Sequence, residues 1–325
     1  MGVLLLHCTN QEIHDFSGRL SFNWFLGLLT HSFMLWPVDV FFMLSGFTLI
    51  RQHSGGVRAF FSRRIKRLLL PVLFWNTVYM LISMRGCFMQ GVYPDSLLLI
   101  LDDFVSFKYN SFLWFFIPLT CIYTSLPFLS LFVLNADRKS LRLFIILSVA
   151  LNILGCFSTI GSESHLYDIF IFGTRYIVFT VAGYYLGNYI LSKNRRRWLY
   201  VAGLISAIVI FVGTVLLQMK MPSNYAFFLK YTNLPCTLTA FAVFVLFKHI
   251  EWNKFINSIR ISQDSLQTLS SMSLGVYLIQ MLGFMVVSKV RIVGDNLILR
   301  FVLMYCGCIC IVFCMKKFPL LRKLV

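Results

Sequence analysis

Long apolar runs that end in clusters of Lys and Arg constrain the fold of this 325-residue chain more than any other feature. The clearest example is the stretch 36–71, which is almost wholly apolar from Val40 to Ile50 and then carries six Lys or Arg between Arg51 and Arg67. An apolar run that stops at dense positive charge marks the cytoplasmic end of a membrane helix. The pattern predicts a membrane span followed by a cytoplasmic basic segment.

Composition excludes a soluble protein, because 58% of the residues are hydrophobic, only 13% are charged and the mean hydropathy is +0.79. The formal charge of +17 would suggest nucleic acid as a partner of a soluble chain. Here the basic residues fall between apolar runs, so we assign them to membrane topology and expect no nucleic acid. The fold class is therefore an all-α polytopic membrane protein.

Apolar runs place about ten transmembrane helices along the chain. The eight residues from Met1 to Cys8 are far short of the ~20 that span a bilayer, so we interpret them as the second half of a helix truncated at its N-terminus. Residues 9–31 are polar enough to predict an external loop. Besides the span at 36–50, the remaining runs lie at 68–84, 112–134, 141–158, 174–191, 198–217, 234–250, 271–287 and 296–314.

The distribution of charge gives an independent check on this topology. The segments expected on the inner side hold 20 of the 29 Lys and Arg residues, which predicts a cytoplasmic C-terminus. No connection is long enough to form a separate soluble domain, so we expect one membrane domain over residues 1–325.

Two residues near outer helix ends are candidates for catalysis. His7 can act as a general base, and the alternative is an interfacial histidine with a structural hydrogen bond. Asp39 borders an apolar run, where a carboxylate is costly unless it is paired; the alternative is an acid that favours the helix dipole. If the two meet, the carboxylate would orient the imidazole as a triad acid does.

Arg63, Arg64 and Arg67 are candidates for binding an anion. On a helix, Arg63 and Arg67 share one face with Arg64 beside them, and guanidinium groups bind phosphate bidentately. The alternative is topological charge in contact with anionic membrane lipid. Arg175 opens a span on the outer side, where the charge bias disfavours it, and Trp114 suits an aromatic belt.

The cysteines predict neither a disulfide framework nor a metal site. Near the C-terminus, Cys306, Cys310 and Cys314 share one helix face while Cys308 points elsewhere, which favours packing or lipid contact over metal binding.

At several points the sequence resembles the acyltransferase 3 family of integral membrane O-acyltransferases, which includes bacterial enzymes that O-acetylate O-antigen and other envelope glycans. LLLHC resembles the histidine that closes the family's first helix, and PVDVFFMLSGF its G-V-D-L-F-F-V-L-S-G-F run. FFSRRIKRLLLP resembles F-x-x-R-R-x-x-R-L-x-P, and SLGVYLIQ resembles S-L-G-I-Y-L-x-H with Gln280 in place of the histidine. Further matches begin at Leu113 and at Arg175.

The resemblance implies a mechanism that joins the two faces of the membrane. Arg63, Arg64 and Arg67 would hold the phosphates of cytosolic acetyl-CoA, which serves as the acyl donor with no metal. His7, oriented by Asp39, would deprotonate a sugar hydroxyl of a lipid-linked or surface glycan, which attacks the thioester directly. Arg175 or Tyr277 would stabilise the oxyanion, and Ser45 would serve close helix packing beside Gly46.

The same resemblance implies a multi-pass protein of the bacterial inner membrane. The family's first helix usually carries an arginine ten residues before the histidine, a position that would precede Met1, so a truncated and inactive relative is one alternative. Another alternative is a non-catalytic transporter or flippase, which would bind an anionic or lipid-linked glycan through the same three arginines.

Overall fold

The fold is seen in a computed structural model that describes residues 1–14, 16, 21–50, 56–91, 96–158, 175–252, 254, 256, 262–289 and 296–325. Within these ranges the regular elements are helices, and no strand occurs. In the described part of the chain, eight helical segments are long and apolar enough to cross a membrane. The all-α polytopic membrane fold is therefore confirmed. The eight segments are Phe22–Leu49, Gly56–Met89, Leu97–Asn135, Arg138–Cys156, Lys193–Lys220, Pro222–His249, Gln263–Val287 and Leu297–Lys317.

The helices belong to two compact units. Unit 1 contains residues 55–117 and 252–325 together with Met1, and unit 2 contains residues 2–54 and 118–251. Unit 1 is built from α4 (Gly56–Arg64), η1 (Ile65–Leu69), α5 (Leu70–Met89), α6 (Leu97–Val105), η2 (Lys108–Phe115), α14 (Gln263–Val287), α15 (Leu297–Lys317) and η4 (Leu321–Leu324). Unit 2 is built mainly from α1 (Gly2–His14), α2 (Phe22–Met34), α3 (Trp36–Leu49), α7 (Phe116–Asn135), α8 (Arg138–Ser158), α10 (Ile177–Asn188), α11 (Lys193–Lys220), η3 (Pro222–Leu229) and α12 (Leu234–His249).

The helices α3 and α10 of unit 2 pack backbone to backbone. A Cβ atom built on Gly46 would lie 1.8 Å from the carbonyl oxygen of Thr180, and one built on Gly183 would lie 1.9 Å from that of Met43. One turn later, a Cβ atom on Gly187 would lie 2.2 Å from the ring of Phe47. Small residues spaced four apart allow this approach between membrane helices. As a result α10, only 12 residues long, is almost wholly buried.

The segment expected to be an external loop is instead largely helical. Ser21 caps α2 by accepting a hydrogen bond from the Trp24 amide at 3.1 Å, and α2 then buries Trp24, Leu28 and His31 along one face. That spacing of three and four residues is typical of an amphipathic helix. The prediction of a loop over residues 9–31 was wrong here because it weighed mean polarity above periodicity.

Elsewhere, polar residues before the apolar runs fix where helices begin. Side chains of Ser192, Ser262 and Asn296 accept hydrogen bonds from amides three residues later, as N-caps do. Ahead of α8, Asp137 accepts a 3.0 Å hydrogen bond from the Ser140 amide. Hydrogen bonds with the side chain and main chain of Ser140 hold the pKa of the Asp137 carboxyl below its usual range.

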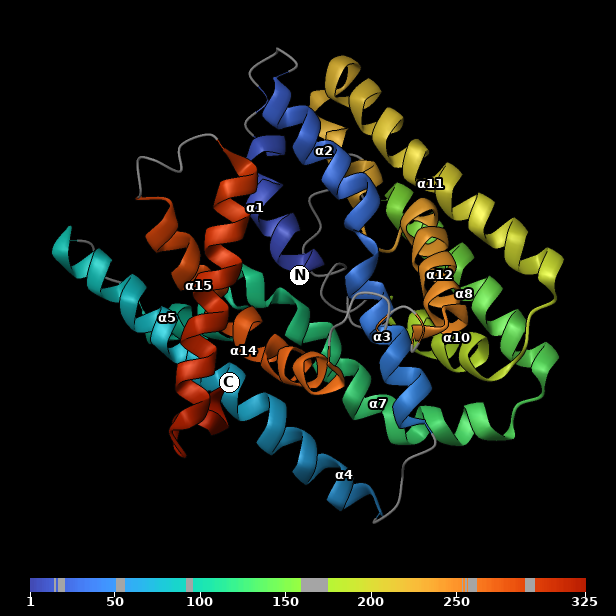
Figure 1. The fold of residues 1–325 in the computed structure, drawn as a ribbon, viewed down its shortest axis with the longest axis horizontal. Coiled ribbons are helices and arrows are strands. Elements are labelled where there is room, and N and C mark those ends of the chain that lie inside the picture. Colours follow the sequence, from blue (N-terminus) through green and yellow to red (C-terminus); the bar gives the residue numbers. More distant parts are fainter. Residues whose placement is uncertain are drawn as a thin grey trace. The chain divides into compact units, whose positions relative to one another are not determined.

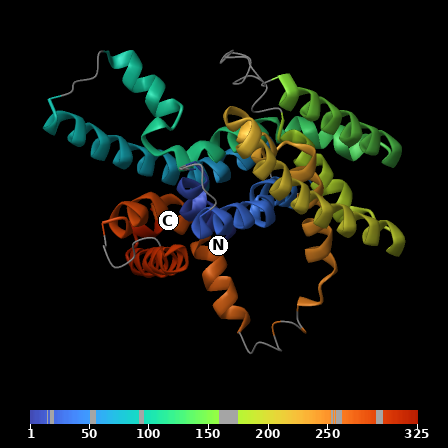
Figure 2. The ribbon, with the colours of Figure 1, turned by 90° about the horizontal axis from the view of Figure 1, so that it is seen from above.

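In unit 1, α4, η1 and α5 form one continuous rod (Figures 1 and 2). Its 34 residues correspond to about 50 Å of helix, whereas the hydrocarbon core of a bilayer is about 30 Å thick. Because α5 alone has the 20 residues that a span needs, we infer that α4 and η1 extend beyond the hydrocarbon.

The other long helices of unit 1 pack through side-chain bonds to main-chain carbonyls. Tyr79 of α5 donates a 2.7 Å hydrogen bond to the Leu278 carbonyl of α14, and Trp75 donates at 2.8 Å to that of Leu324. On α15, Cys308 is buried while Cys306, Cys310 and Cys314 are exposed. The division of these cysteines between two faces is as the sequence predicted.

Replacing Gly183 or Gly46 with Ala should destabilise the protein, because the added methyl group would meet a backbone carbonyl that cannot rotate away. Overpacking of this kind costs about 1–3 kcal/mol or more. Thermal unfolding in detergent measures the effect. The matched control is Gly307→Ala, since a Cβ atom at Gly307 meets nothing within 4 Å; equal melting temperatures for all three variants would contradict the packing.

Candidate active site

His7 lies on α1, in a part of unit 2 where α1 packs against α2. Nε2 of His7 is enclosed by the protein, although the side chain as a whole is only partly buried. The two helices approach closely: a Cβ atom on Gly27 would lie 3.3 Å from the Thr9 carbonyl oxygen. The imidazole is therefore held by packed helices and not by a mobile loop.

A second imidazole, that of His31 on α2, lies within electrostatic range of His7. Nδ1 of His31 is 3.0 Å from the Gly27 carbonyl oxygen and 3.3 Å from the Thr9 hydroxyl. Because a carbonyl only accepts, Nδ1 carries the proton, and Nε2 is the acceptor in the neutral ring. The two imidazoles are close enough for a charge on one to act on the other. We did not predict His31, and the apolar period of α2 is the signal that would have identified it as inward-facing.

Asp39 is fully buried in the first turn of α3. Among the described residues, neither of its carboxylate oxygens has a hydrogen-bond partner, so the expected bond to His7 is absent here. Its surroundings are weakly polar: the charge of Asp39 would act on Tyr176, Tyr231 and Cys236. A buried carboxylate without a partner is costly in free energy, which is why such groups in membrane proteins point to function.

Arg175 directly precedes Tyr176 and the first turn of α10. Its Nη2 atom donates a 3.5 Å hydrogen bond to the Gly155 carbonyl, and its own carbonyl accepts a 3.0 Å bond from the Asn152 amide group. No ion pair between Arg175 and Asp39 is found in the described part of unit 2. The guanidinium group is thus tied to α8, on the same unit as Asp39.

Ser45 is committed to its own helix. Its hydroxyl donates a 3.1 Å hydrogen bond to the Phe41 carbonyl, and its neighbour Gly46 makes the closest contact with α10. This position suits the packing role that the sequence suggested.

The three arginines of unit 1 lie where the rod changes geometry. Arg63 and Arg64 end α4, whereas Arg67 lies in the π-helical segment η1. Arg63 and Arg67 are exposed, and the guanidinium carbon of Arg64 lies 5.5 Å from the centroid of the Phe60 ring. The helix therefore continues through Arg67, but with a π-helical turn in place of a regular α-helical one.

Pro71 explains the change of geometry. Proline has no amide hydrogen and its ring crowds the carbonyl four residues earlier, which here belongs to Arg67. The helix accommodates the proline by a wider turn, in which the Leu70 amide donates a hydrogen bond to the Ile65 carbonyl, five residues back. Such π segments are frequent at functional sites.

Tyr277 and Trp114, the remaining candidates, both lie in unit 1. The Tyr277 hydroxyl donates a hydrogen bond to the Phe112 carbonyl, and its ring packs 5.6 Å from that of Phe116. Trp114 is partly buried in η2, with its ring 6.4 Å from Phe115. In this structure the Tyr277 hydroxyl is therefore engaged by the main chain of its own unit.

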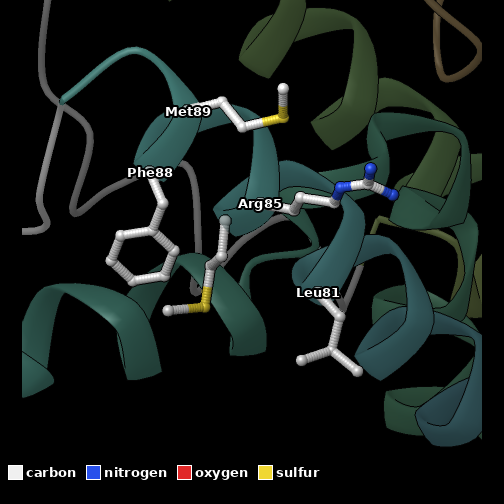
Figure 3. A pocket seen from close by; sticks show the side chains of 5 residues that line it. Leu81, Arg85, Phe88 and Met89 are labelled. Atoms are coloured by element: carbon white, nitrogen blue, oxygen red, sulfur yellow. The ribbon is translucent and has the colours of Figure 1, made fainter.

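A pocket at the far end of α5 contains none of the predicted residues. It is lined by Leu81, Met84, Arg85, Phe88 and Met89, all from one helix (Figure 3). Apart from Arg85 its walls are apolar, so we assign it no chemistry.

The comparison with known families follows the same residues. The family model for an acyltransferase domain, acyltransferase 3, matches residues 1–317. The chain belongs to the acyltransferase 3 family. Comparisons with curated proteins and with solved structures gave no match. Family membership and the eight apolar helical segments make this chain a multi-pass membrane acyltransferase.

Replacing Asp39 with Asn should separate stability from activity. The amide has the shape of the carboxylate but costs less to bury, so the variant should melt at the same or a higher temperature. Acyl transfer should fall by about 10²-fold or more if the carboxylate acts on a proton. Thermal unfolding and transfer assays on the same preparation measure both effects. A variant with full activity would show that Asp39 has no part in the chemistry.

Proposed function

We propose that this acyltransferase moves an acetyl group from cytosolic acetyl-CoA to a sugar hydroxyl of a surface polysaccharide, such as O-antigen, capsule or a related envelope glycan. The protein would lie in the bacterial inner membrane with its C-terminus in the cytoplasm. The observation that carries the proposal is the arginine-rich end of the α4–η1–α5 rod, in a chain whose family transfers acyl groups.

The arginine cluster suits the nucleotide part of the donor. Arg63 and Arg67 are exposed on a helix that is longer than a bilayer is thick, so their guanidinium groups can reach phosphates at the membrane surface. Positive charge at a membrane boundary also marks the cytoplasmic side, where acetyl-CoA is made. The donor therefore meets the protein at the end where the charge is concentrated.

His7 is the general base of the proposed reaction. Its Nε2 atom takes the proton of a sugar hydroxyl as that oxygen attacks the carbonyl carbon of the thioester. The C–O bond forms and the C–S bond breaks, so that the coenzyme leaves as a thiolate and takes up a proton. The products are an O-acetyl ester and free coenzyme A. His31 lies in the same unit, close enough for its charge to act on His7, and Asp39 belongs to that unit as well.

Replacing His7 with Ala should lower acetyl transfer by about 10²–10⁴-fold, the usual contribution of a general base. Purified protein in vesicles, radiolabelled acetyl-CoA and isolated polysaccharide provide the assay. His249→Ala is the control, because His249 is an exposed histidine whose Nδ1 lies 2.8 Å from the Val245 carbonyl of its own helix. If both variants transferred acetyl groups at the wild-type rate, His7 would not be the base.

Replacing both Arg63 and Arg67 with Gln should weaken donor binding. Removing charge-assisted hydrogen bonds to phosphate raises the Michaelis constant for acetyl-CoA, and we expect an increase of about tenfold or more for two such bonds. The control is Arg195→Gln with Arg197→Gln, which removes the same charge from two exposed arginines on α11. If both double variants raised the Michaelis constant equally, Arg63 and Arg67 would serve only the general charge balance of the membrane topology and would not form a binding site.

A further inference from the structure

Unit 1 contains three buried amide side chains whose hydrogen-bonding capacity is incomplete. Asn76 of α5, Asn110 of η2 and Gln280 of α14 are each no more than 1% exposed. Within the described residues, Oδ1 of Asn76, Nδ2 of Asn110 and both amide atoms of Gln280 have no partner. Leaving such groups unpaired costs free energy, so a cluster of them needs an explanation.

The orientation of the two asparagine amides is fixed by the bonds that they do make. Nδ2 of Asn76 donates a 2.8 Å hydrogen bond to the Phe104 carbonyl, and Oδ1 of Asn110 accepts a 3.1 Å bond from the Phe112 amide. A carbonyl only accepts and an amide N–H only donates, so neither side chain can be flipped. Asn76 therefore offers an open acceptor and Asn110 an open donor.

The three elements that carry these amides, α5, η2 and α14, contact one another close to them in the chain. Tyr79, one turn after Asn76, bonds to the Leu278 carbonyl of α14. On α14, Tyr277 and Phe284 flank Gln280 on one face, and both contact Phe112 of η2, through a hydrogen bond and a ring contact at 6.4 Å respectively. Phe112 is also the residue whose amide holds Asn110. The contacts on either side of the amides thus bring the three elements together around them.

We propose that Asn76, Asn110 and Gln280 form a binding site for a neutral chain that carries two amide groups, namely the pantetheine arm of the acyl donor. The open atoms are two acceptors, on Asn76 and Gln280, and two donors, on Asn110 and Gln280. Two secondary amides offer the complement, with two N–H donors and two carbonyl acceptors. This inference rests on the proposed function, because it takes an acyl-CoA as the donor.

The position of the site along the rod agrees with this ligand. Asn76 follows Arg67 by nine residues on the same continuous helix, a separation of about 13 Å at 1.5 Å per residue. A donor whose phosphates contact the exposed arginines would pass from their face of the rod to the buried face that carries Asn76 as its uncharged arm extends into the hydrocarbon depth. In that environment no water is present to hydrogen-bond the two amide groups of the arm, so the protein must supply their partners.

Gln280→Met is the test, because it removes both open atoms and keeps an unbranched side chain of similar size. In purified full-length protein it should leave the melting temperature unchanged or higher, since no bond is lost. It should weaken binding of pantetheine and of acetyl-CoA by about tenfold, which corresponds to two neutral hydrogen bonds, and leave binding of adenosine 3′,5′-bisphosphate unchanged. The Arg63→Gln, Arg67→Gln variant should show the reverse, with weaker binding of the bisphosphate and unchanged binding of pantetheine. Gln267→Met, at an exposed position of the same helix, is the control.

The outcomes separate this inference from the proposed function. If the wild-type protein binds acetyl-CoA, and Gln280→Met binds pantetheine as tightly as the wild type does, then the amide site is wrong but the proposal that acetyl-CoA is the donor is unaffected. If wild-type protein binds neither acetyl-CoA nor its parts, both fall together. A Gln280→Met variant that raised the Michaelis constant for the glycan alone would assign the amides to the acceptor and overturn the inference. Gln280→Asn, which keeps the amide but shortens its reach, carries the same test if the methionine variant does not fold.

Discussion

The close approach of α3 and α10 is the constraint on which unit 2 depends. Two glycines, Gly46 and Gly183, place each backbone against the carbonyls of the other helix. Without a hydrophobic force between helices in lipid, such packing is what holds them together. It also determines what lies beside the catalytic candidates, because Asp39 is on α3 and Tyr176 immediately precedes α10. The contact between the rings of Phe42 and Tyr176, at 4.9 Å, follows directly from this packing.

Unit 1 depends instead on the interruption of one long helix. Pro71 removes a backbone donor where the basic segment meets the span, and the wider turn of η1 takes up the change. The arginines and one of the buried amides, Asn76, are consequently carried by one rod, with the charge at its end and this neutral polar group further along it. That order matches a ligand with a charged head and an uncharged arm.

The sequence predicted what depends on composition and local pattern. Apolar runs and basic clusters were sufficient for the membrane fold, and helical spacing alone separated Cys308 from the other cysteines of α15. Several motifs taken together, among them those around His7, Asp39 and Arg63, led to the correct family. Loop prediction failed over residues 22–31 because a mixed segment can still bury one face, as Trp24 and His31 do.

Tertiary contacts account for what the sequence could not show. Nothing in the sequence around Gln280 indicates that neither of its amide atoms finds a partner within the described residues, since this depends on what α5 and η2 present to α14. The missing bond between His7 and Asp39 is of the same kind: it depends on how α1 and α3 pack, not on their motifs.

The central claim is that the protein transfers acetyl groups to a glycan on the far side of the membrane from their donor. Its most direct measurement is the O-acetyl content of purified surface polysaccharide, determined by NMR in cells with and without the intact protein. The account predicts that one set of O-acetyl resonances disappears with the protein and returns when it is restored. Identical spectra for every envelope glycan would contradict it.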